Sequence, residues 1–448
     1  MYKFFNLTTN KMIIAAATLL LAAGCANGND GRSPGWLLGL GTSTPKTSSI
    51  AAQDDQLRFA SIDKALQEEV DNNIRAGFVA RIVTSQGPVY ETAIGMADRE
   101  NGLAMASDTR FRIASMTKPI VSAAIMRLVD DGKVRLNDPV SKFIPAFANA
   151  RVATSTKKRA DGTYATRPAN KDITVHHLLT HTAGLGYAFL FESDLDKDYL
   201  AVNPFFTSGT LEERIDLIAS LPLYVDPGVT WIYSYATDVL GRVIEVASGS
   251  DLETYLRQTF FDPLGMNDTA FLLDQDDFNR VATVYGFDET GGLIPADTSA
   301  LGADVNSTPF GIMSGGGGLI SNAPDYGRFC QMLLNGGAFE GGRVLSEASV
   351  RLLMTNALPE AARTEEWRRT GLSFTLGGLI VLEPGYTGRV ATEGGWGWGG
   401  YWDTYFVINR KDDVGVIVMT QTQPGPLNPT SRANDIVRAV AYAAAKKP

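Results

Sequence analysis

Residues 111–119 read Phe-Arg-Ile-Ala-Ser-Met-Thr-Lys-Pro, and apolar residues then recur every three or four positions as far as Gly132. This spacing predicts a buried helix that begins near Ser115. Pro119 fits that prediction because proline is tolerated in the first turn of a helix. Residues three apart share a helical face, so the side chains of Ser115 and Lys118 are expected to meet.

Ser115 and Lys118 are the residue types of a nucleophile and its activating base. A serine hydroxyl is a weak nucleophile that needs a base. A lysine with an ordinary pKa of about 10.4 is protonated at neutral pH, but burial disfavours its charge and can make it a usable base. Alternatively, the lysine stays charged and acts on a nearby tyrosine. N–H groups at the start of the helix can hold a developing oxyanion. The Ser-x-x-Lys pattern alone is weak evidence for catalysis, because a helix-capping serine followed by an exposed lysine has the same sequence pattern.

Regular elements are expected at both ends of the chain and in its middle, from apolar spacing and turn residues. The expected helices are 57–74, 211–221, 239–247 and 431–446, and the expected strand pairs are 78–84 with 89–97 and 401–409 with 414–421. We therefore predict an α/β (α+β) fold in which residues 55–135 and 311–448 build an antiparallel sheet flanked by helices. Residues 136–310 are expected to form an inserted, mainly helical domain.

Further motifs occur in a recognisable order along the chain. They are Leu-Leu-Thr-His-Thr-Ala-Gly-Leu at 178–185, Pro-Gly-Val-Thr-Trp-Ile-Tyr-Ser-Tyr at 227–235, Phe-Asp-Pro-Leu-Gly-Met at 261–266, Ser-Gly-Gly-Gly-Gly-Leu at 314–319 and Gly-Gly-Trp-Gly-Trp-Gly-Gly at 394–400. Together with residues 108–118 they resemble the serine β-lactamase and penicillin-binding family. The resemblance is closest to its class C branch and to the family VIII carboxylesterases, and it runs from about residue 56 to 446.

The resemblance implies the β-lactamase/DD-peptidase-like fold and a set of catalytic residues. It makes Ser115 the nucleophile, Lys118 its partner and Tyr233 the general base that later returns its proton to the leaving group. It leaves open which of Lys118 and Tyr233 carries the proton at rest. The oxyanion hole would consist of the backbone N–H groups of Ser115 and Tyr401. No cofactor is implied.

Two positions depart from the lactamase pattern. Tyr235 stands where a lactamase usually has an asparagine, and Trp398 stands where the family has a lysine or histidine. Without a cation for the carboxylate of a β-lactam, the site should accept neutral esters more readily. Substrate-binding roles are expected for Tyr235, Trp398, Gly399 and Gly400, and for Trp396 as part of an acyl pocket.

The sequence therefore favours a carboxylesterase that acts on small-molecule esters through an acyl-Ser115 intermediate. A class C-like β-lactamase, a D-Ala-D-Ala peptidase and an acyltransferase remain as enzyme alternatives. The non-enzyme alternative is a lipoprotein that binds cell-wall peptides, and the presence of Ser115, Lys118 and Tyr233 together argues against it.

The first residues predict export. Residues 1–24 combine two lysines with an apolar run of signal-peptide length and end in Leu-Ala-Ala-Gly before Cys25, which resembles a bacterial lipobox. We expect Cys25 to be lipidated and 25–54 to be a flexible tether. By resemblance to the sorting rules of bacterial lipoproteins, Ala26 rather than an aspartate after the cysteine favours the outer membrane, with the protein facing the periplasm. An ordinary secretory peptide that happens to carry a cysteine is the alternative.

Composition excludes several other classes. The 448 residues carry a formal net charge of −9, whereas a nucleic-acid binder usually has a basic excess. Only two cysteines, Cys25 and Cys330, are present, so neither a disulfide framework nor a CxxC zinc site is available. Cys330 is expected to be a buried thiol in an amphipathic helix. We predict no metal and no nucleic-acid partner.

Three short patterns match other motifs only by their letters. Gly-Arg-Ser-Pro-Gly at 31–35 fits a nucleophile elbow around Ser33, but no strand precedes it and no helix follows. The glycines of 395–400 fit a dinucleotide motif, yet a strand-like segment follows them rather than a helix. His177 and His181 have zinc-ligand spacing, but a packed structural role is the better interpretation, since no further ligand is indicated.

Overall fold

The structure is a computed structural model that describes residues 47–187, 193–205, 208–298, 304–306, 313–425 and 428–444, with side chains from Arg58 onward. The predicted signal peptide 1–24, Cys25 and Ser33 lie outside the described residues. Of the tether 25–54, only the backbone of the last residues is described.

The largest sheet in the described residues has eight antiparallel strands in the order β12-β13-β14-β15-β16-β1-β2-β3. Strand β16 pairs with β1, with Val79 opposite Met419, so the two ends of the chain meet in the middle of the sheet. The strands are β1 (Gly77–Thr84), β2 (Gly87–Asp98), β3 (Leu103–Ala104), β12 (Leu372–Phe374), β13 (Leu379–Val381), β14 (Trp396–Gly399), β15 (Tyr405–Asn409) and β16 (Val414–Met419).

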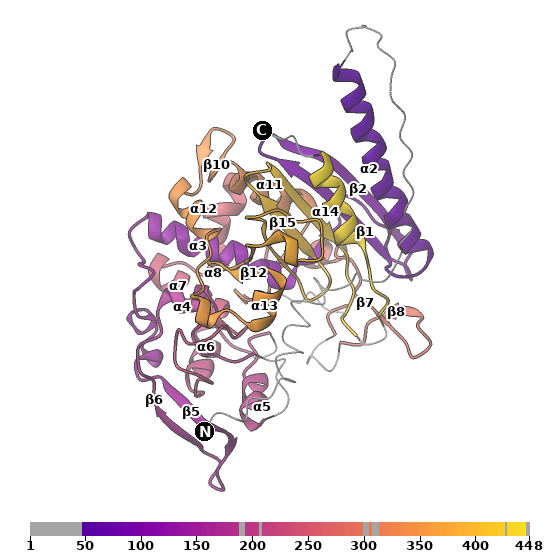
Figure 1. Ribbon diagram of the computed structural model, residues 1–448. Helices are drawn as coiled ribbons and strands as arrows, with labels where there is room; N and C mark the ends of the chain where they lie inside the picture. The colour runs from indigo at the N-terminus through magenta and orange to yellow at the C-terminus, as the bar shows by residue number, and fades with distance from the viewer. Residues whose placement is uncertain are drawn as a thin grey trace.

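Helices cover both faces of this sheet (Figure 1). Alternate residues of a strand point to opposite faces. Phe78, Ala80 and Ile82 of β1 pack in the core under α2 (Thr47–Asp71) and α14 (Ala433–Ala444). Val79 and Val83 belong to the larger core on the other face, where α11 (Ala323–Leu334) packs on β1, β15 and β16. The predicted antiparallel sheet flanked by helices is confirmed.

Two boundaries differ from the sequence prediction by more than three residues. Helix α2 begins at Thr47, within the segment expected to be tether, and not at Leu57. Residues 47–56 lack glycine and proline, so nothing interrupts a helix that spreads backward from the packed turns. The predicted strand 401–409 is shorter, because Asp403 has a positive φ of 68° and 401–404 form a turn before β15.

The middle of the chain is mainly helical, as expected, with two hairpins added. None of the strands of the eight-stranded sheet falls within the described part of 136–310; the division into two domains stays a prediction. The elements there are η2 (Val140–Lys142), η3 (Pro145–Phe147), β5 (Arg151–Lys158), β6 (Tyr164–Pro168), α4 (Val175–Leu179), α5 (Asp194–Ala201), α6 (Leu211–Ala219), α7 (Ala236–Ser248), α8 (Leu252–Leu256), a π-helical turn (Arg257–Phe261), α9 (Asp262–Leu264), α10 (Gln275–Phe278), β7 (Tyr285–Phe287) and β8 (Leu293–Pro295).

Helix α3 (Thr117–Asp130) joins the two parts of the molecule. It packs against α7 of the middle segment and against α12 (Glu347–Leu353) of the C-terminal part. Eleven of its fourteen residues are buried, which confirms the predicted buried helix. The remaining elements are β4 (Phe111–Arg112), η1 (Ala114–Met116), β9 (Ile320–Ser321), β10 (Ala338–Phe339), β11 (Gly342–Arg343), η6 (Glu360–Ala362), α13 (Glu365–Thr370) and η7 (Pro384–Tyr386).

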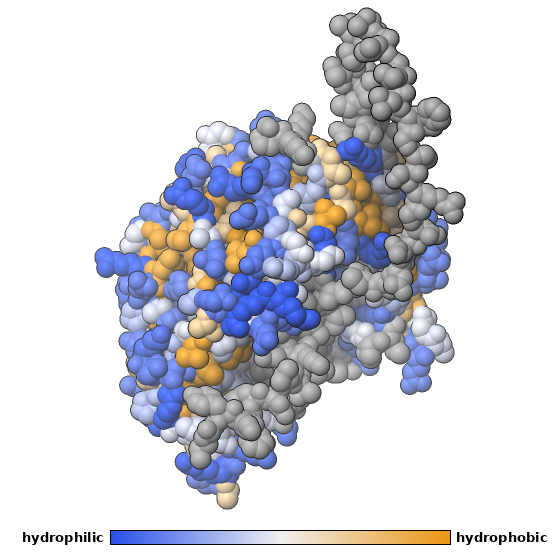
Figure 2. Space-filling view, viewed as in Figure 1, coloured by the Kyte–Doolittle hydropathy of each residue, from blue (hydrophilic) through white to orange (hydrophobic). Residues whose placement is uncertain are grey.

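The surface in Figure 2 mixes hydrophilic residues with smaller hydrophobic groups, as on an ordinary globular protein. Among the helices whose residues are described, none combines the length and the apolarity needed to cross a bilayer.

Candidate active site

Ser115 lies on a tight turn that the neighbouring chain fixes. Strand β4 pairs with β9, and the N–H of Ile113 donates to the carbonyl of Leu319 at 3.1 Å. The chain then turns through η1 into α3, with Ala114 at a φ of +43°. A residue other than glycine in this left-handed region is uncommon and costs on the order of 1 kcal/mol. Ser115 therefore lies in η1, before the regular helix α3 begins at Thr117.

Lys118 lies one helical turn along and has no exposed surface. Its Nζ donates to Ser115 Oγ at 3.1 Å and to the carbonyl oxygen of Gly316 at 2.5 Å. The predicted meeting of the two side chains is therefore present. Among the described residues, no carboxylate forms an ion pair with this buried amine.

Tyr233 reaches the same hydroxyl from a segment 118 residues away. Its OH donates to Ser115 Oγ at 2.7 Å, and its ring centroid lies 4.5 Å from Lys118 Nζ. Two backbone hydrogen bonds hold the segment, from Ile232 N–H to the His181 carbonyl at 2.9 Å and from Tyr235 N–H to the Gly186 carbonyl at 3.1 Å. The three side chains that the sequence proposed as catalytic meet at one oxygen.

Aromatic rings surround the Tyr233 phenol. Trp398 donates its indole N–H to the Tyr233 oxygen at 3.3 Å. His181 lies 4.9 Å from the Tyr233 ring, centroid to centroid, and its Nδ1 is 3.0 Å from Ser234 Oγ. Burial, with the charge of Lys118, lowers the pKa of His181 well below its ordinary value. This histidine is therefore neutral where it packs beside the tyrosine ring.

Comparison with known proteins gives the family of the chain. The beta-lactamase family matches residues 62–441, more than half of the chain. The chain belongs to the beta-lactamase family. Protein Rv1367c of Mycobacterium tuberculosis is 33% identical over 367 residues, which cover 80% of this chain and 89% of that protein. Esterase EstB of Burkholderia gladioli is 31% identical over 403 residues, covering 85% and 93%.

A solved structure has a similar fold. EstCE1, described as a hydrolase with promiscuous acyltransferase activity, superposes with a TM-score of 0.69 at 26% identity. It covers 88% of this chain and 100% of its own. The expected beta-lactamase-type fold is confirmed.

Tyr187 is a residue of this beta-lactamase-family site that the sequence analysis missed. Its ring is 5.1 Å from the Tyr233 ring and 5.4 Å from Lys118 Nζ. Burial first, and then the neighbouring Tyr233, raises the pKa of Tyr187 well above its ordinary value, while a hydrogen bond with the Ser115 side chain opposes the rise. The phenol therefore stays protonated beside the nucleophile. Its position two residues after Leu185 of the second motif was the only available signal.

The glycines at the end of β14 bring that strand against the nucleophile turn. A Cβ on Gly400 would lie 2.4 Å from the Ile113 carbonyl oxygen and 2.1 Å from Thr404 Oγ1. We expected these glycines to admit substrate, but at Gly400 the close neighbour is the chain before Ser115. Gly399 is the last residue of β14. The contact places the chain that leads into Tyr401 beside η1, and the oxyanion role of the Tyr401 N–H stays a prediction.

Two of the expected substrate-binding residues are fully buried in the structure. Tyr235 has no exposed surface, its hydroxyl donates to the Tyr199 carbonyl at 3.2 Å, and its ring braces Tyr187 at 4.6 Å. Trp396 is also fully buried, and its indole N–H donates to Thr375 Oγ1 at 2.8 Å. Both side chains belong to the packed interior, because their polar atoms are already bonded inside the protein.

Metal ligation finds no support in the described residues, which contain no cluster of three or more histidine, cysteine, aspartate or glutamate side chains. His177 completes a helix cap, its Nδ1 accepting from the Thr174 N–H at 3.1 Å. Cys330 is fully buried in α11, as expected. The glycines of 395–400 lead through a turn into β15, not into a helix.

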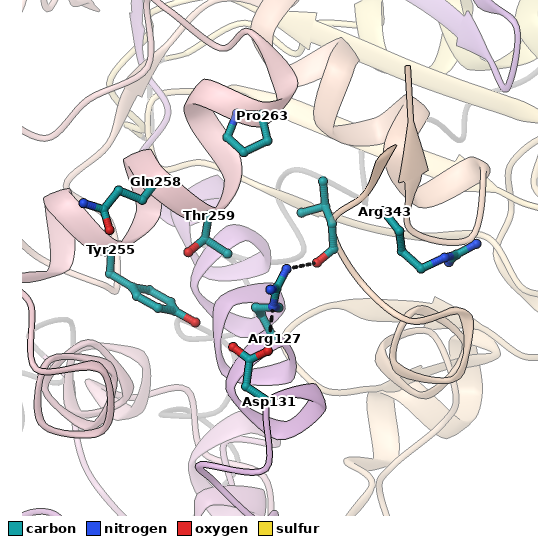
Figure 3. Close-up of a pocket in the computed structure, with 8 residues that line it drawn as sticks. Arg127, Asp131, Tyr255, Gln258, Thr259, Pro263 and Arg343 are labelled. Carbon is teal, nitrogen blue, oxygen red and sulfur yellow. Dashed lines mark hydrogen bonds and ion pairs between the residues drawn. The ribbon is translucent and has the colours of Figure 1, made fainter. Parts of the chain in front are cut away.

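Figure 3 shows a small polar hollow of about 160 Å³ that is lined by Arg127 and Asp131. These residues lie at the C-terminal end of α3, whereas Ser115 precedes its N-terminal end. Arg127 is held by Asp131 Oδ1 at 3.0 Å and by the Val344 carbonyl at 3.0 Å. None of the proposed catalytic residues lines this hollow, so it is separate from the candidate active site.

Proposed function

We propose that the chain is a carboxylesterase that hydrolyses carboxylic esters through an acyl-Ser115 intermediate. One observation carries the proposal: Ser115 Oγ lies within hydrogen-bonding distance of both Lys118 Nζ and the Tyr233 hydroxyl. A serine so placed can pass its proton to a base as it attacks, which is the requirement for nucleophilic catalysis. The beta-lactamase family assignment and the relative named as an esterase support the same chemistry.

The proposed reaction has two halves. Ser115 Oγ attacks the ester carbonyl carbon and its proton passes into the Lys118–Tyr233 pair. The N–H groups of Ser115 and Tyr401 hold the oxyanion. The tetrahedral species then collapses, the alcohol leaves with the proton from Tyr233, and the acyl group stays on Ser115. Water, activated by the same pair, releases the acid and restores the serine.

Trp398 supports esters over β-lactams as substrates. It occupies the position where the family resemblance expects a cation, and its indole N–H bonds to Tyr233 instead. An indole offers no charge for the carboxylate of a β-lactam, so a neutral ester suffers no comparable loss. Binding to the substrate by Trp398, Gly399 and Gly400 is part of this proposal.

Acyl transfer is the second candidate. The acyl-enzyme reacts with whichever nucleophile reaches it, and EstCE1 is named as a hydrolase with promiscuous acyltransferase activity. Adding an alcohol acceptor to the esterase assay separates the two. A new ester formed at the expense of free acid shows transfer.

The test is a panel of p-nitrophenyl acetate, butyrate and octanoate beside nitrocefin, on the wild type and Ser115→Ala. We expect ester turnover to exceed nitrocefin turnover and to vanish in the Ser115→Ala variant, while its melting temperature stays close to that of the wild type. Ser33→Ala should be silent. Nitrocefin turnover above ester turnover would favour a β-lactamase. Absence of both turnover and a fluorophosphonate adduct, with a control hydrolase labelled, would favour a peptide-binding protein.

We also propose that the protein is an exported lipoprotein anchored through Cys25, at the outer membrane facing the periplasm. The apolar run and the Leu-Ala-Ala-Gly-Cys sequence that ends at Cys25 support this. Expression in a bacterial host with labelled palmitate should label the wild type and not Cys25→Ser. An unlabelled wild type that is exported points to an ordinary secretory peptide.

A further inference from the structure

Asp238, in the first turn of α7, is a buried carboxylate that the reaction scheme above does not use. It has no exposed surface. Its Oδ1 accepts a hydrogen bond from the Gly316 N–H at 3.1 Å and another from Ser314 Oγ. Among the described residues, no donor reaches its other oxygen, Oδ2. Burying a carboxylate of which only one oxygen is hydrogen-bonded costs free energy. Such a group is therefore expected to have a role or a compensating charge.

The Asp238 contacts lead directly to the active-site lysine. Gly316, whose N–H is fixed by Asp238, presents its carbonyl oxygen to Lys118 Nζ at 2.5 Å. The same peptide segment therefore connects the carboxylate on α7 with the amine on α3. Since Lys118 also donates to Ser115 Oγ at 3.1 Å, the carbonyl decides where the amine stands relative to the nucleophile.

Gly315 and Gly316 leave the space that this contact needs. A Cβ on Gly316 would lie 2.3 Å from Asp238 Oδ2, and one on Gly315 would lie 2.5 Å from the Thr237 carbonyl oxygen. Real Cβ atoms do not approach so closely, so any side chain would push the segment off α7 and carry the Gly316 carbonyl away from Lys118.

Titratable side chains from three parts of the chain surround Asp238. Burial raises the pKa of Asp238 above its ordinary value, while the Ser314 hydrogen bond and the charges of Lys118 on α3 and Arg214 on α6 oppose the rise and favour the ionised form. His181, after α4, is neutral through burial, and the phenol of Tyr187 is raised in pKa partly by Asp238 itself. Helix α8 faces α7 with the apolar Leu252 at Gly241. Lys118 is therefore the only cation of the described catalytic cluster with which the carboxylate interacts.

We propose that Asp238 is a positioning residue for the esterase reaction. Through Ser314 and Gly316 it holds the carbonyl that orients Lys118. Its negative charge sets the pH range over which the Lys118–Tyr233 pair accepts the serine proton. The inference rests on the proposed function of Ser115. A negative neighbour favours the protonated state of whichever member of the pair is the base. Removing it moves deprotonation to lower pH in either case, by an amount on the order of one pH unit.

The test compares Asp238→Asn with the wild type in two assays. One is kcat and KM for p-nitrophenyl butyrate from pH 5 to 10. The other is the rate of fluorophosphonate labelling of Ser115 over the same range, which needs no ester turnover. We expect kcat to fall at least tenfold with little change in KM, and the acid limb of both profiles to move to lower pH. An unchanged kcat with an unshifted limb overturns the inference. Asp216→Asn, on an exposed position of α6, is the matched control and should be silent.

Ser314→Ala separates position from charge and serves if Asp238→Asn does not fold. It removes one of the two hydrogen bonds to Asp238 and leaves the carboxylate in place. We expect a several-fold lower kcat with an unshifted acid limb. Full kcat in this variant contradicts the positioning role. A wild type that neither turns over esters nor labels at Ser115 contradicts the proposed function instead, so the two failures are distinguishable.

Discussion

Replacing Tyr233 by phenylalanine removes one oxygen from the centre of the proposed machinery. The ring keeps its partners, His181 at 4.9 Å, Trp231 at 5.8 Å and Trp398 at 5.6 Å between ring centroids. What is lost is the 2.7 Å hydrogen bond to Ser115 Oγ and the 3.3 Å bond from the Trp398 indole N–H. Folding should therefore be weakened by only about 1–3 kcal/mol.

Catalysis should suffer far more than stability. A positioned general acid–base contributes roughly 10²–10⁴ in rate, so kcat/KM for p-nitrophenyl butyrate should fall by that factor. At about 1.36 kcal/mol per tenfold change, the barrier rises by roughly 3–5 kcal/mol. The loss should lie in kcat, because the phenol acts on the transferring proton and not on the bound ester.

Tyr199→Phe is the matched control. Tyr199 is a fully buried tyrosine whose hydroxyl donates to the Pro222 carbonyl at 3.2 Å and, within the described part of the chain, not to Ser115. It should lose similar stability and keep its kcat/KM. The assay measures initial rates and thermal melts of both variants beside the wild type. A Tyr233→Phe enzyme within threefold of the wild type would refute the role of the phenol.

Two further substitutions and one labelling experiment have definite expected outcomes. Lys118→Met should remain folded, because an apolar side chain suits a fully buried position. Its kcat/KM in the same ester assay should fall at least about 10³-fold. Activity within tenfold of the wild type contradicts the role of Lys118. Gly400→Ala places a Cβ 2.4 Å from the Ile113 carbonyl oxygen. Thermal melts should show stability lower by about 1–3 kcal/mol, and initial rates should show a lower kcat. A variant with unchanged stability and kcat shows that the contact relaxes freely. Burial raises the pKa of the Cys330 thiol, so Ellman's reagent should leave it unmodified in the native protein and react after denaturation; rapid native modification of Cys330 contradicts its burial.

The sequence was informative where contacts are local. The three-residue spacing of Ser115 and Lys118 predicted their meeting because helical geometry alone brings them together. The two apolar terminal segments predicted the sheet because each strand has its own pattern of hydrophobic and turn residues. Tyr233 was accessible only through a motif resemblance, since 118 residues separate it from Ser115.

Tertiary contacts explain what the sequence missed. Asp238 contacts Gly316, and Gly316 contacts Lys118, only once α7 and the glycine segment pack on α3, and no spacing in the chain reveals these contacts. Tyr235 and Trp396 were assigned to the substrate because they stand beside Tyr233 and Trp398 in the motifs. A motif position does not tell which side chains the surrounding protein has already enclosed, and the structure shows both with no exposed surface.

The most direct test is the site of covalent modification by a fluorophosphonate, read by mass spectrometry of the intact protein and of its peptides. A single adduct on the peptide that contains Ser115, absent in Ser115→Ala and slowed in Lys118→Met, is the predicted result. An adduct on another serine, such as Ser33, together with ester hydrolysis that survives in Ser115→Ala, would contradict the account.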